Sequence, residues 1–499
     1  MIKAYGIPIR DLLSGNKKRP TKMSLDSVHI HWGKHLNLQH QKIIAWVAIL
    51  VFACCILGVM TRPFSHLAFF WPANAVLISA FLRFPKLNNS YGWFGAVLGY
   101  MVSDLSTGNT FYLTSVLSIA NLITVAVTLW LIRGFNVNYF DYDKGFTFLK
   151  LAAICGIAGL SSTIFAVSTV PYVPNTFMST DRLWIDFGMW WSGEMVNCVI
   201  LLPFLLAFPK WKHVKHALYN RRQLRFRPQK VFPVFAIALS IGFTYVFPGP
   251  GAMLYPLATL IWAALSYRLF SISIINIFIF VAAYHTLKTF FFDQSAEVYL
   301  ASAVSVRIGL SMLVLAPLIV CIISRNRQKL FKEILYLANH DSLTHTMNRR
   351  YFFQAAETFL TRSPKSPFAL MMLDIDYFKK INDLYGHNIG DHVLQHFSNL
   401  VNANMREQDL FARIGGEEFI VLLNNTRELE ALDIAERIRK NVEREPLNLS
   451  GHAPIYLTVS IGITLQQFAK PQQLKDYMIT ADFALYSAKS KGRNRVMIA

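Results

Sequence analysis

The stretch RIGGEEFIVLL, residues 413–423, places two adjacent glycines and then two adjacent glutamates between short β-type segments. This pattern predicts a hairpin with Glu417 and Glu418 near its tip. Gly415 and Gly416 permit a tight two-residue turn, and they leave space for a phosphate chain to approach the backbone. Because the chain has a formal net charge of +20, two carboxylates at a hairpin tip indicate a functional site.

A second acidic pair ends the apolar run FALMMLDID, residues 368–376. Asp374 and Asp376 are two apart in this predicted strand, so both carboxylates point to the same face. Acidic residues at such a place often form turns, but a neighbouring strand that carries the hairpin would bring its glutamates close. Clustered carboxylates repel one another unless a cation joins them. Mg²⁺ typically takes one or two carboxylates together with substrate phosphates, so the two acidic pairs predict a magnesium site.

The chain after residue 340 has the alternating pattern of an α/β domain. Helices are expected at 348–361, 379–384, 389–404, 427–444 and 471–491, and strands at 368–376, 409–414, 417–423 and 455–464. The pattern assigns residues 341–499 to one cytoplasmic α/β domain.

The preceding chain is strongly apolar. Of the 499 residues, 54% are hydrophobic and only 16% are charged, whereas soluble domains average roughly 25% charged residues. Apolar runs predict about ten transmembrane helices, at 43–60, 67–84, 91–105, 111–133, 146–170, 183–208, 231–248, 252–267, 269–292 and 301–324. The rest of the chain therefore divides into a basic N-terminal segment (1–42), a multi-span α-helical membrane domain (43–324) and a connector (325–340).

Basic residues cluster in the loops that share a side with the N-terminus. The densest set is Lys210, Lys212, Lys215, Arg221, Arg222, Arg225, Arg227 and Lys230. The opposite loops offer little beyond Arg62 and Arg182, so the positive-inside rule predicts that both termini are cytoplasmic. A basic loop also attracts acidic lipid or nucleic acid. Its place beside apolar segments favours membrane lipid as the partner and argues against nucleic acid.

Two ionisable residues lie deep in the predicted spans, Glu194 and Arg307. Such groups are costly in lipid and usually face the interior of the helix bundle. Two interpretations are open: they belong to a ligand cavity, or they form an internal ion pair with an architectural role.

The connector carries Leu330, Ile334 and Leu337, which are spaced four and then three residues apart, as in a heptad seam. The seam is too short for a stable coiled coil by itself. It either pairs two chains that the membrane domain holds together, or it is the apolar face of a helix that packs on its own domain.

The membrane domain resembles the bacterial integral membrane sensor domains called MASE. The resemblance rests on FFWPANAVLISAFL (69–82) and WWSGEMVNCVILLPFLLAF (190–208), and it covers about residues 40–324. It implies a sensor rather than a pore or carrier, placed in the inner membrane of a bacterium.

The α/β domain resembles the GGDEF family of diguanylate cyclases, in the variant with Glu at the third position. GGEEF (415–419) is joined in order by DSLTHTMNRR (341–350), DIDYFKKINDLYGHNIGD (374–391), SIG (460–462) and ADFALYSAKSKGRN (481–494). The departure is His345, where the family usually has Gly; it lies outside the acidic pairs. The resemblance implies a palm-like fold that makes cyclic di-GMP from two GTP and releases two pyrophosphates.

The resemblance also implies roles for individual residues. Asp374, the Ile375 carbonyl, Glu417 and Glu418 are expected to hold Mg²⁺ or Mn²⁺, and Glu417 to act as the base for the 3′-hydroxyl. The expected substrate contacts are Asn382 and Asp391 on the guanine edge, His387, Gly415 and Gly416 beside the nucleotide, and Lys379, Lys489 and Arg493 on the phosphates. Since each monomer holds one GTP, a homodimer is required for catalysis.

The sequence REQD, residues 406–409, has two interpretations. Arg406 and Asp409 form an ordinary helical i,i+3 pair, or, with Arg437, they match the family's product-inhibition site for cyclic di-GMP. For the whole chain, the alternatives to a cyclase are a catalytically silent nucleotide-binding domain and a transporter with a regulatory tail.

Overall fold

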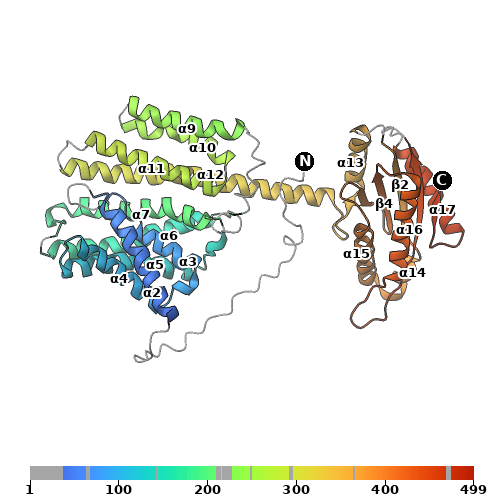
Figure 1. Ribbon diagram of the computed structural model, residues 1–499, viewed down its shortest axis with the longest axis horizontal. Coiled ribbons are helices and arrows are strands. Elements are labelled where there is room, and N and C mark those ends of the chain that lie inside the picture. Colours follow the sequence, from blue (N-terminus) through green and yellow to red (C-terminus); the bar gives the residue numbers. More distant parts are fainter. Residues whose placement is uncertain are drawn as a thin grey trace. The chain divides into compact units, whose positions relative to one another are not determined.

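The computed structural model describes residues 38–62, 68–141, 144, 146–174, 176–209, 215, 228–247, 250–291, 296–362, 366–467 and 474–499. The chain forms two compact units, Met1–Ile322 and Ile323–Ala499, called here the helical unit and the α/β unit (Figure 1). The basic N-terminal segment up to residue 37 and most of the basic loop at 210–227 lie outside the described residues.

The helical unit has a helix at each of the ten places where the sequence predicts one. These are α2 (Leu38–Val59), α3 (Ala73–Arg83), α4 (Ser90–Ser106), α5 (Phe111–Gly134), α6 (Thr147–Thr169), α7 (Leu183–Ala207), α9 (Pro228–Val246), α10 (Pro256–Ser266), α11 (Leu269–Phe291) and the first part of α12 (Ala296–Asn339). The positions follow the apolar runs because only a helix satisfies its own backbone in lipid.

Six of the described helices are long and apolar enough to cross a membrane: α2, α5, α6, α7, α11 and α12. With 11 residues each, α3 and α10 fall short of a full span, because 11 residues rise only about 16 Å against a hydrocarbon core of about 30 Å. The ten helix positions are therefore confirmed, whereas the number of full spans stays a prediction.

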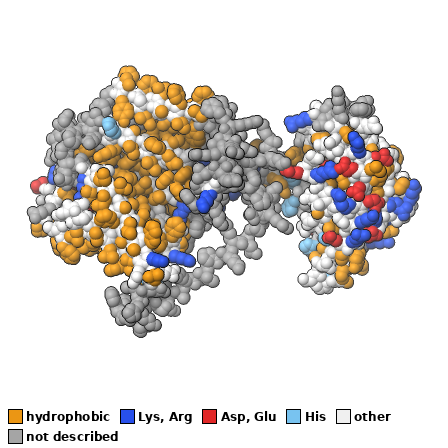
Figure 2. Space-filling model, viewed as in Figure 1, with side chains coloured by type: hydrophobic (Ala, Val, Ile, Leu, Met, Phe, Trp, Pro, Cys, Tyr) orange, Lys and Arg blue, Asp and Glu red, His pale blue; other side chains and the backbone are white. Residues whose placement is uncertain are grey.

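The surface of the helical unit suits a lipid environment. Hydrophobic side chains cover most of its visible face in Figure 2, whereas Lys, Arg, Asp and Glu are scattered over the α/β unit. Large aromatic side chains are among the most exposed: Trp46 is 71% exposed, Trp130 69% and Trp184 85%. In water such a surface is unfavourable, but in a membrane it faces lipid tails.

A six-stranded mixed sheet forms the centre of the α/β unit, in the order β1-β3-β4-β2-β5-β6. The strands are β1 (Met347–Asn348), β2 (Phe368–Ile375), β3 (Leu410–Arg413), β4 (Glu418–Asn424), β5 (Val459–Gln466) and β6 (Val496–Ile498). The four central strands are antiparallel, and β1 and β6 add to the edges in parallel. The sequence did not predict the short edge strands, and β5 begins at Val459 rather than at the predicted residue 455.

Helices cover both faces of the sheet (Figure 1). Along β2, Leu370 and Met372 pack with α13 (Arg349–Arg362) and α17 (Leu474–Ser490). The alternate residues Met371 and Leu373 pack with α15 (His387–Ala403) and α16 (Glu428–Arg444). Since side chains alternate along a strand, Asp374 belongs to the same face as α17.

One glycine sets the spacing between α17 and the sheet. A Cβ on Gly462 of β5 would lie 2.2 Å from the Ala481 carbonyl oxygen and 2.2 Å from the Leu485 amide nitrogen, both in α17. Any side chain at this place would push α17 away from the sheet. The close approach brings the C-terminal end of α17, with Lys489, to the edge where β2 ends.

The helix α12 has 44 residues and contains the connector. The seam residues Leu330, Ile334 and Leu337 are 58%, 54% and 64% exposed. More than half of each side chain is therefore exposed, which argues against the interpretation that the seam packs on its own domain. Pairing with a second chain stays a prediction.

Candidate active site

The hairpin tip lies between β3 and β4. Arg413 pairs with Phe419 in the sheet, and the Ile414 amide donates to the Glu418 carbonyl at 3.0 Å. The loop inside this bond is Gly415-Gly416-Glu417, so the predicted two-residue turn is wrong by one residue. Neither glycine is in the left-handed region, and a Cβ on Gly416 would meet no atom within 4 Å. The predicted phosphate contact therefore depends on the open space beside Gly416 and not on the type of turn.

The sheet brings the two acidic pairs together. Asp374, near the end of β2, is the direct partner of Glu418 on β4, and the Ile375 amide donates to the Glu417 carbonyl at 3.4 Å. Directly paired residues share a face of the sheet and lie about 5 Å apart. Glu417 is half-buried, Glu418 is exposed, and Asp374 is buried at 6% exposure.

A lysine partly balances this negative charge. Lys489 Nζ on α17 lies 2.8 Å from Asp374 Oδ2. Burial raises the pKa of Asp374, Lys489 counteracts the rise, and the charges of Glu417 and Glu418 add to it. The charges of Glu417 and Glu418 therefore act on Asp374, and an added cation would relieve this repulsion.

The carboxylate and carbonyl oxygens at this strand edge meet some of the requirements of a magnesium site. The oxygens are hard ligands, as Mg²⁺ prefers. Among the described residues, however, no group of three or more His, Cys, Asp or Glu side chains is placed to hold a metal by itself. The arrangement suits a metal that shares its ligands with substrate phosphates, which is the usual way of binding Mg²⁺ at nucleotide sites.

Asp376 has a different role from Asp374. Its carboxylate accepts hydrogen bonds from Ser460 Oγ at 2.7 Å, from Thr458 Oγ1 at 2.8 Å and from the Asn494 amide at 3.0 Å. Asp376 therefore fixes the turn after α17 to the end of β2. Sequence reasoning missed this role, although the acid and the KGRN turn were both in the quoted motifs.

The turn that Asp376 fixes presents a second cation. Arg493 has φ +61°, its guanidinium carbon lies 4.6 Å from the Tyr377 ring centre, and Nη1 donates to Tyr377 Oη at 3.4 Å. Lys379 is exposed on the neighbouring helix α14 (Phe378–Tyr385). The predicted phosphate-binding residues thus come from α14, α17 and the turn after α17.

The predicted base-reading residues lie at the junction of α14 and α15. A Cβ on Gly390 would lie 1.8 Å from Asn382 Oδ1, so only glycine permits this contact. Asn382 Oδ1 is buried and has no hydrogen-bond partner among the described residues. Asp391 follows Gly390, and His387 opens α15 one turn earlier on the same face. An unsatisfied amide beside an exposed carboxylate suits a polar base edge.

Arg413, which the sequence analysis did not single out, holds the hairpin tip through the hydrogen bonds and the ion pair that follow, together called the Arg413 brace. Arg413 donates through Nε and Nη2 to the Gly416 carbonyl, at 3.0 and 2.7 Å. Its Nη1 lies 3.1 Å from Asp341 Oδ1, which also accepts from the Thr344 amide and hydroxyl. Burial raises the pKa of Asp341, but the bonds from Thr344 and the charge of Arg413 outweigh it and lower the pKa. The brace links the hairpin to the segment that directly follows α12.

The REQD residues form a turn, not a helix, so the helical i,i+3 interpretation is wrong. Asp409 accepts from the backbone amides of Arg406 and Asn424, at 2.9 and 3.2 Å. The Arg406 guanidinium pairs instead with Glu430 on α16. Arg437, two turns further along α16, donates to Asn404 Oδ1 at 3.0 Å. Arg406 and Arg437 thus line the same surface between α16 and the turn.

In the helical unit, Glu194 and Arg307 do not form an ion pair, so that interpretation is wrong. Arg307 is fully buried and donates to the carbonyls of Met189 and Ala68, at 2.7 and 2.5 Å. Glu194 instead accepts from Asn74 at 2.5 Å and lines a cavity.

The fold and the site define a class: an apolar multi-helix domain that precedes an α/β domain whose acidic and basic side chains suit a nucleotide and a metal ion. Residues 338–495 match the family described as diguanylate cyclase, GGDEF domain, and residues 43–328 match MASE1. The chain is 27% identical to the probable diguanylate cyclase DgcF of Escherichia coli O157:H7, over 88% of this chain and 91% of that protein. It is 31% identical to DgcF of Escherichia coli K12, over 61% of this chain and 95% of that protein.

Among solved structures, the coiled coil and GGDEF domain of DgcB from Caulobacter crescentus, in complex with c-di-GMP, is 29% identical. The match covers 36% of this chain and 93% of the DgcB chain, and its TM-score is 0.33. From the family models and the DgcF relatives, the chain belongs to the family of probable diguanylate cyclases in which a MASE1 membrane domain precedes a GGDEF domain.

Proposed function

We propose that the chain condenses two GTP molecules to cyclic di-GMP with release of two pyrophosphates, under the control of its membrane domain. The observation that carries the proposal is the pairing of Asp374 with Glu418 across β2 and β4, with Glu417 beside them and Lys489 Nζ 2.8 Å from Asp374. This combination offers oxygen ligands, a base and a phosphate-binding cation at one strand edge.

In the proposed reaction, Glu417 accepts the proton of the 3′-hydroxyl that attacks an α-phosphate. Lys379, Lys489 and Arg493 hold the phosphates, and Gly416 lets them approach the hairpin backbone. Such a transfer depends mostly on positioning and on neutralising charge. Asp374, the Ile375 carbonyl, Glu417 and Glu418 would hold Mg²⁺ or Mn²⁺, which when bound lowers the pKa of the hydroxyl and stabilises the leaving pyrophosphate.

Asn382 and Asp391 read the guanine edge, and His387 contacts the substrate. The support is the buried oxygen of Asn382, which lacks a hydrogen-bond partner among the described residues. A base that matches this amide removes the unsatisfied group, whereas a mismatched base leaves it buried and unpaired. This difference would give the site its preference for GTP over ATP.

Two chains must meet for the product to form, because each site holds one GTP. The exposed seam of Leu330, Ile334 and Leu337 supports pairing of two copies through the connector. The helix α12 continues from the membrane domain into the connector. The membrane domain can therefore control the cyclase reaction by changing dimerisation or the angle between the paired helices.

Cyclic di-GMP would also bind at Arg406, Asp409 and Arg437 as a feedback inhibitor. Both arginines are about half exposed, and a guanidinium can grip a guanine or phosphate at two points. The excess of basic residues in the loops on the N-terminal side supports a cytoplasmic location of both termini in a bacterial cell, with the helical unit in the inner membrane.

The test uses the full chain in lipid nanodiscs with GTP and Mg²⁺. Nucleotide chromatography and a pyrophosphate assay should give two pyrophosphates for each cyclic di-GMP. Release of GDP and phosphate, or binding of GTP without turnover, would contradict the proposal.

A further inference from the structure

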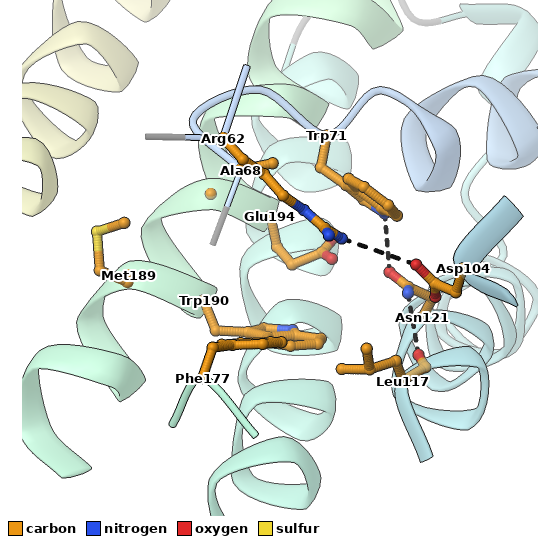
Figure 3. A pocket seen from close by; sticks show the side chains of 11 residues that line it. Arg62, Ala68, Trp71, Asp104, Leu117, Asn121, Phe177, Met189, Trp190 and Glu194 are labelled. Atoms are coloured by element: carbon orange, nitrogen blue, oxygen red, sulfur yellow. Dashed lines mark hydrogen bonds and ion pairs between the residues drawn. The ribbon is translucent and has the colours of Figure 1, made fainter. Parts of the chain in front are cut away.

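The helical unit contains a partly open cavity of about 60 Å³. A single water needs only roughly 10–15 Å³. The cavity therefore has room for a small organic molecule. Its lining comes from the segment after α2, from α4, α5 and α7, and from the loop before α7 (Figure 3).

The lining has two acidic side chains and one basic side chain. Asp104 and Glu194 contribute two carboxylates and Arg62 one cation. Arg62 Nη2 lies 3.7 Å from Asp104 Oδ1, which is too far for a hydrogen bond. Asp104 is 2% exposed, and its Oδ1 has no hydrogen-bond partner among the described residues. Asp104 lines the cavity, and a buried carboxylate oxygen without a hydrogen-bond partner indicates a missing donor.

Glu194 is held in place but is not paired with a cation among the described residues. Its Oε1 accepts from Asn74 Nδ2 at 2.5 Å, and Asn74 in turn donates to Asn121 and accepts from Tyr100. This buried network fixes the carboxylate at the cavity wall. A buried carboxylate without a counter-charge is unfavourable in a membrane and usually marks a functional site.

Aromatic rings make up much of the remaining wall: Trp71, Phe177 and Trp190. In Figure 3 the Trp71 ring lies above, and the Trp190 ring below, the ends of Arg62 and Glu194. Hydrogen bonds fix both indoles, from Trp71 Nε1 to Asn121 at 3.0 Å and from Trp190 Nε1 to Ser162 at 3.3 Å. Ring faces beside carboxylates are the environment that organic ammonium ions prefer.

We propose that this cavity is a binding site for a small organic ammonium ion. The ammonium group donates to Glu194 and to the unsatisfied Asp104 oxygen, and the alkyl part packs on Trp190 and Phe177. An anion is disfavoured because two carboxylates face it and Arg62 is already beside Asp104. A neutral molecule would leave the two acidic side chains with Arg62 as the one basic side chain among the described lining residues. The proposal concerns the membrane domain alone, so it stands or falls independently of the cyclase reaction.

The experiment measures binding of three probes of one size to the full chain in nanodiscs, by calorimetry: n-butylammonium, 1-butanol and butyrate. The account predicts saturable binding of n-butylammonium, and affinities at least tenfold weaker for butanol and butyrate. Equal binding of butanol, or tighter binding of butyrate, would overturn the proposal, as would no binding of n-butylammonium.

Two charge variants sharpen the test. Glu194→Gln keeps the size of the side chain and its acceptor for Asn74, and it should weaken n-butylammonium binding at least tenfold. Arg62→Gln removes the competing cation and should tighten the same binding, whereas a site for anions would lose its ligand. The control Asp181→Asn removes one exposed charge outside the cavity and should leave the affinity unchanged.

A third cavity variant, at Phe177, tests the proposal even if Glu194→Gln fails to fold. Phe177 is half-buried and lines the cavity, so Phe177→Leu keeps an apolar side chain there and removes the ring face. Its affinity for n-butylammonium should fall several-fold while 1-butanol binding stays the same. An unchanged affinity for n-butylammonium, in Phe177→Leu or in folded Glu194→Gln, would overturn the proposal.

Discussion

Lys489 Nζ on α17 lies 2.8 Å from Asp374 Oδ2 at the end of β2. The pair joins a residue expected to bind phosphate to one expected to bind metal. We infer that the lysine balances Asp374 until nucleotide and metal arrive, and then moves to the phosphates. The close packing at Gly462 makes this possible, because it brings α17 onto the strand edge.

Lys489→Ala should therefore lower kcat/KM for GTP by roughly 10²- to 10³-fold, the usual loss when a group that stabilises transition-state charge is removed. Lys489→Arg keeps the charge and should retain more activity. Lys491→Ala is the matched control, since Lys491 is exposed two residues further on. Steady-state cyclic di-GMP production measures all three variants, and equal losses for Lys489→Ala and Lys491→Ala would exclude a specific role for Lys489.

Asn382→Ala should reduce the preference for GTP over ATP more than it reduces metal binding. The buried Asn382 oxygen without a hydrogen-bond partner is the group that the correct base would satisfy. Turnover of GTP and ATP by the wild type and the variant gives the ratio, and Asn402→Ala, at an exposed site on α15, is the control. If the ratio is the same in all three proteins, the base is read elsewhere.

Arg413 and Asp341 should be energetically coupled. The Arg413 guanidinium holds both Asp341 and the Gly416 carbonyl, so Arg413→Ala should lower the turnover rate by more than its effect on stability explains. A double-mutant cycle with Asp341→Asn should give a coupling free energy of about 1 kcal/mol, typical of contacting residues. Thermal unfolding of the four proteins measures it, and additive effects would show that the brace is not formed.

The same pair gives a pH dependence with a definite sign. The pKa of Asp341 is lowered in the folded protein. Its contribution to stability is therefore present above the pKa of the unfolded chain and is lost as pH falls through the folded pKa. In Asp341→Asn the acid-induced loss of stability should be smaller than in the wild type.

Arg406→Ala should relieve feedback inhibition without changing the initial rate. Since Arg406 pairs with Glu430 when no product is bound, Glu430→Gln should have the opposite effect and strengthen inhibition. Arg444→Ala, at an exposed arginine at the end of α16, is the control. Inhibition curves with added cyclic di-GMP give the inhibition constant of each of the three variants. Identical constants would show that Arg406 and Asp409 are surface residues without a role in product binding.

The sequence predicted the parts of the fold that depend on local pattern. Hydrophobic runs located the ten helices of the helical unit and β2, and the glycine pair between short β-type segments located β3 and β4. The short edge strands β1 and β6 were missed because two or three residues carry no periodic signal. Helix lengths in the membrane were overestimated at α3 and α10, where prolines and neighbouring turns set the ends.

The roles that sequence reasoning missed depend on partners distant in the chain. Asp376 and Asp374 look equivalent in DID, but Ser460, Thr458 and Asn494 engage only Asp376. Glu194 and Arg307 look like an ion pair by depth, but Arg307 donates to backbone carbonyls instead. Depth and spacing do not fix the direction in which a side chain points, and packing decides it.

The central claim is tested most directly by Glu417→Gln in the full chain. Glu417 is half-buried at the hairpin tip, so the amide should fold normally and show an unfolding temperature close to that of the wild type. Losing the base and a metal-binding carboxylate should lower cyclic di-GMP formation from GTP by more than about 10³-fold, since both contribute to the transition state. A folded Glu417→Gln protein that makes cyclic di-GMP at the wild-type rate would contradict the account.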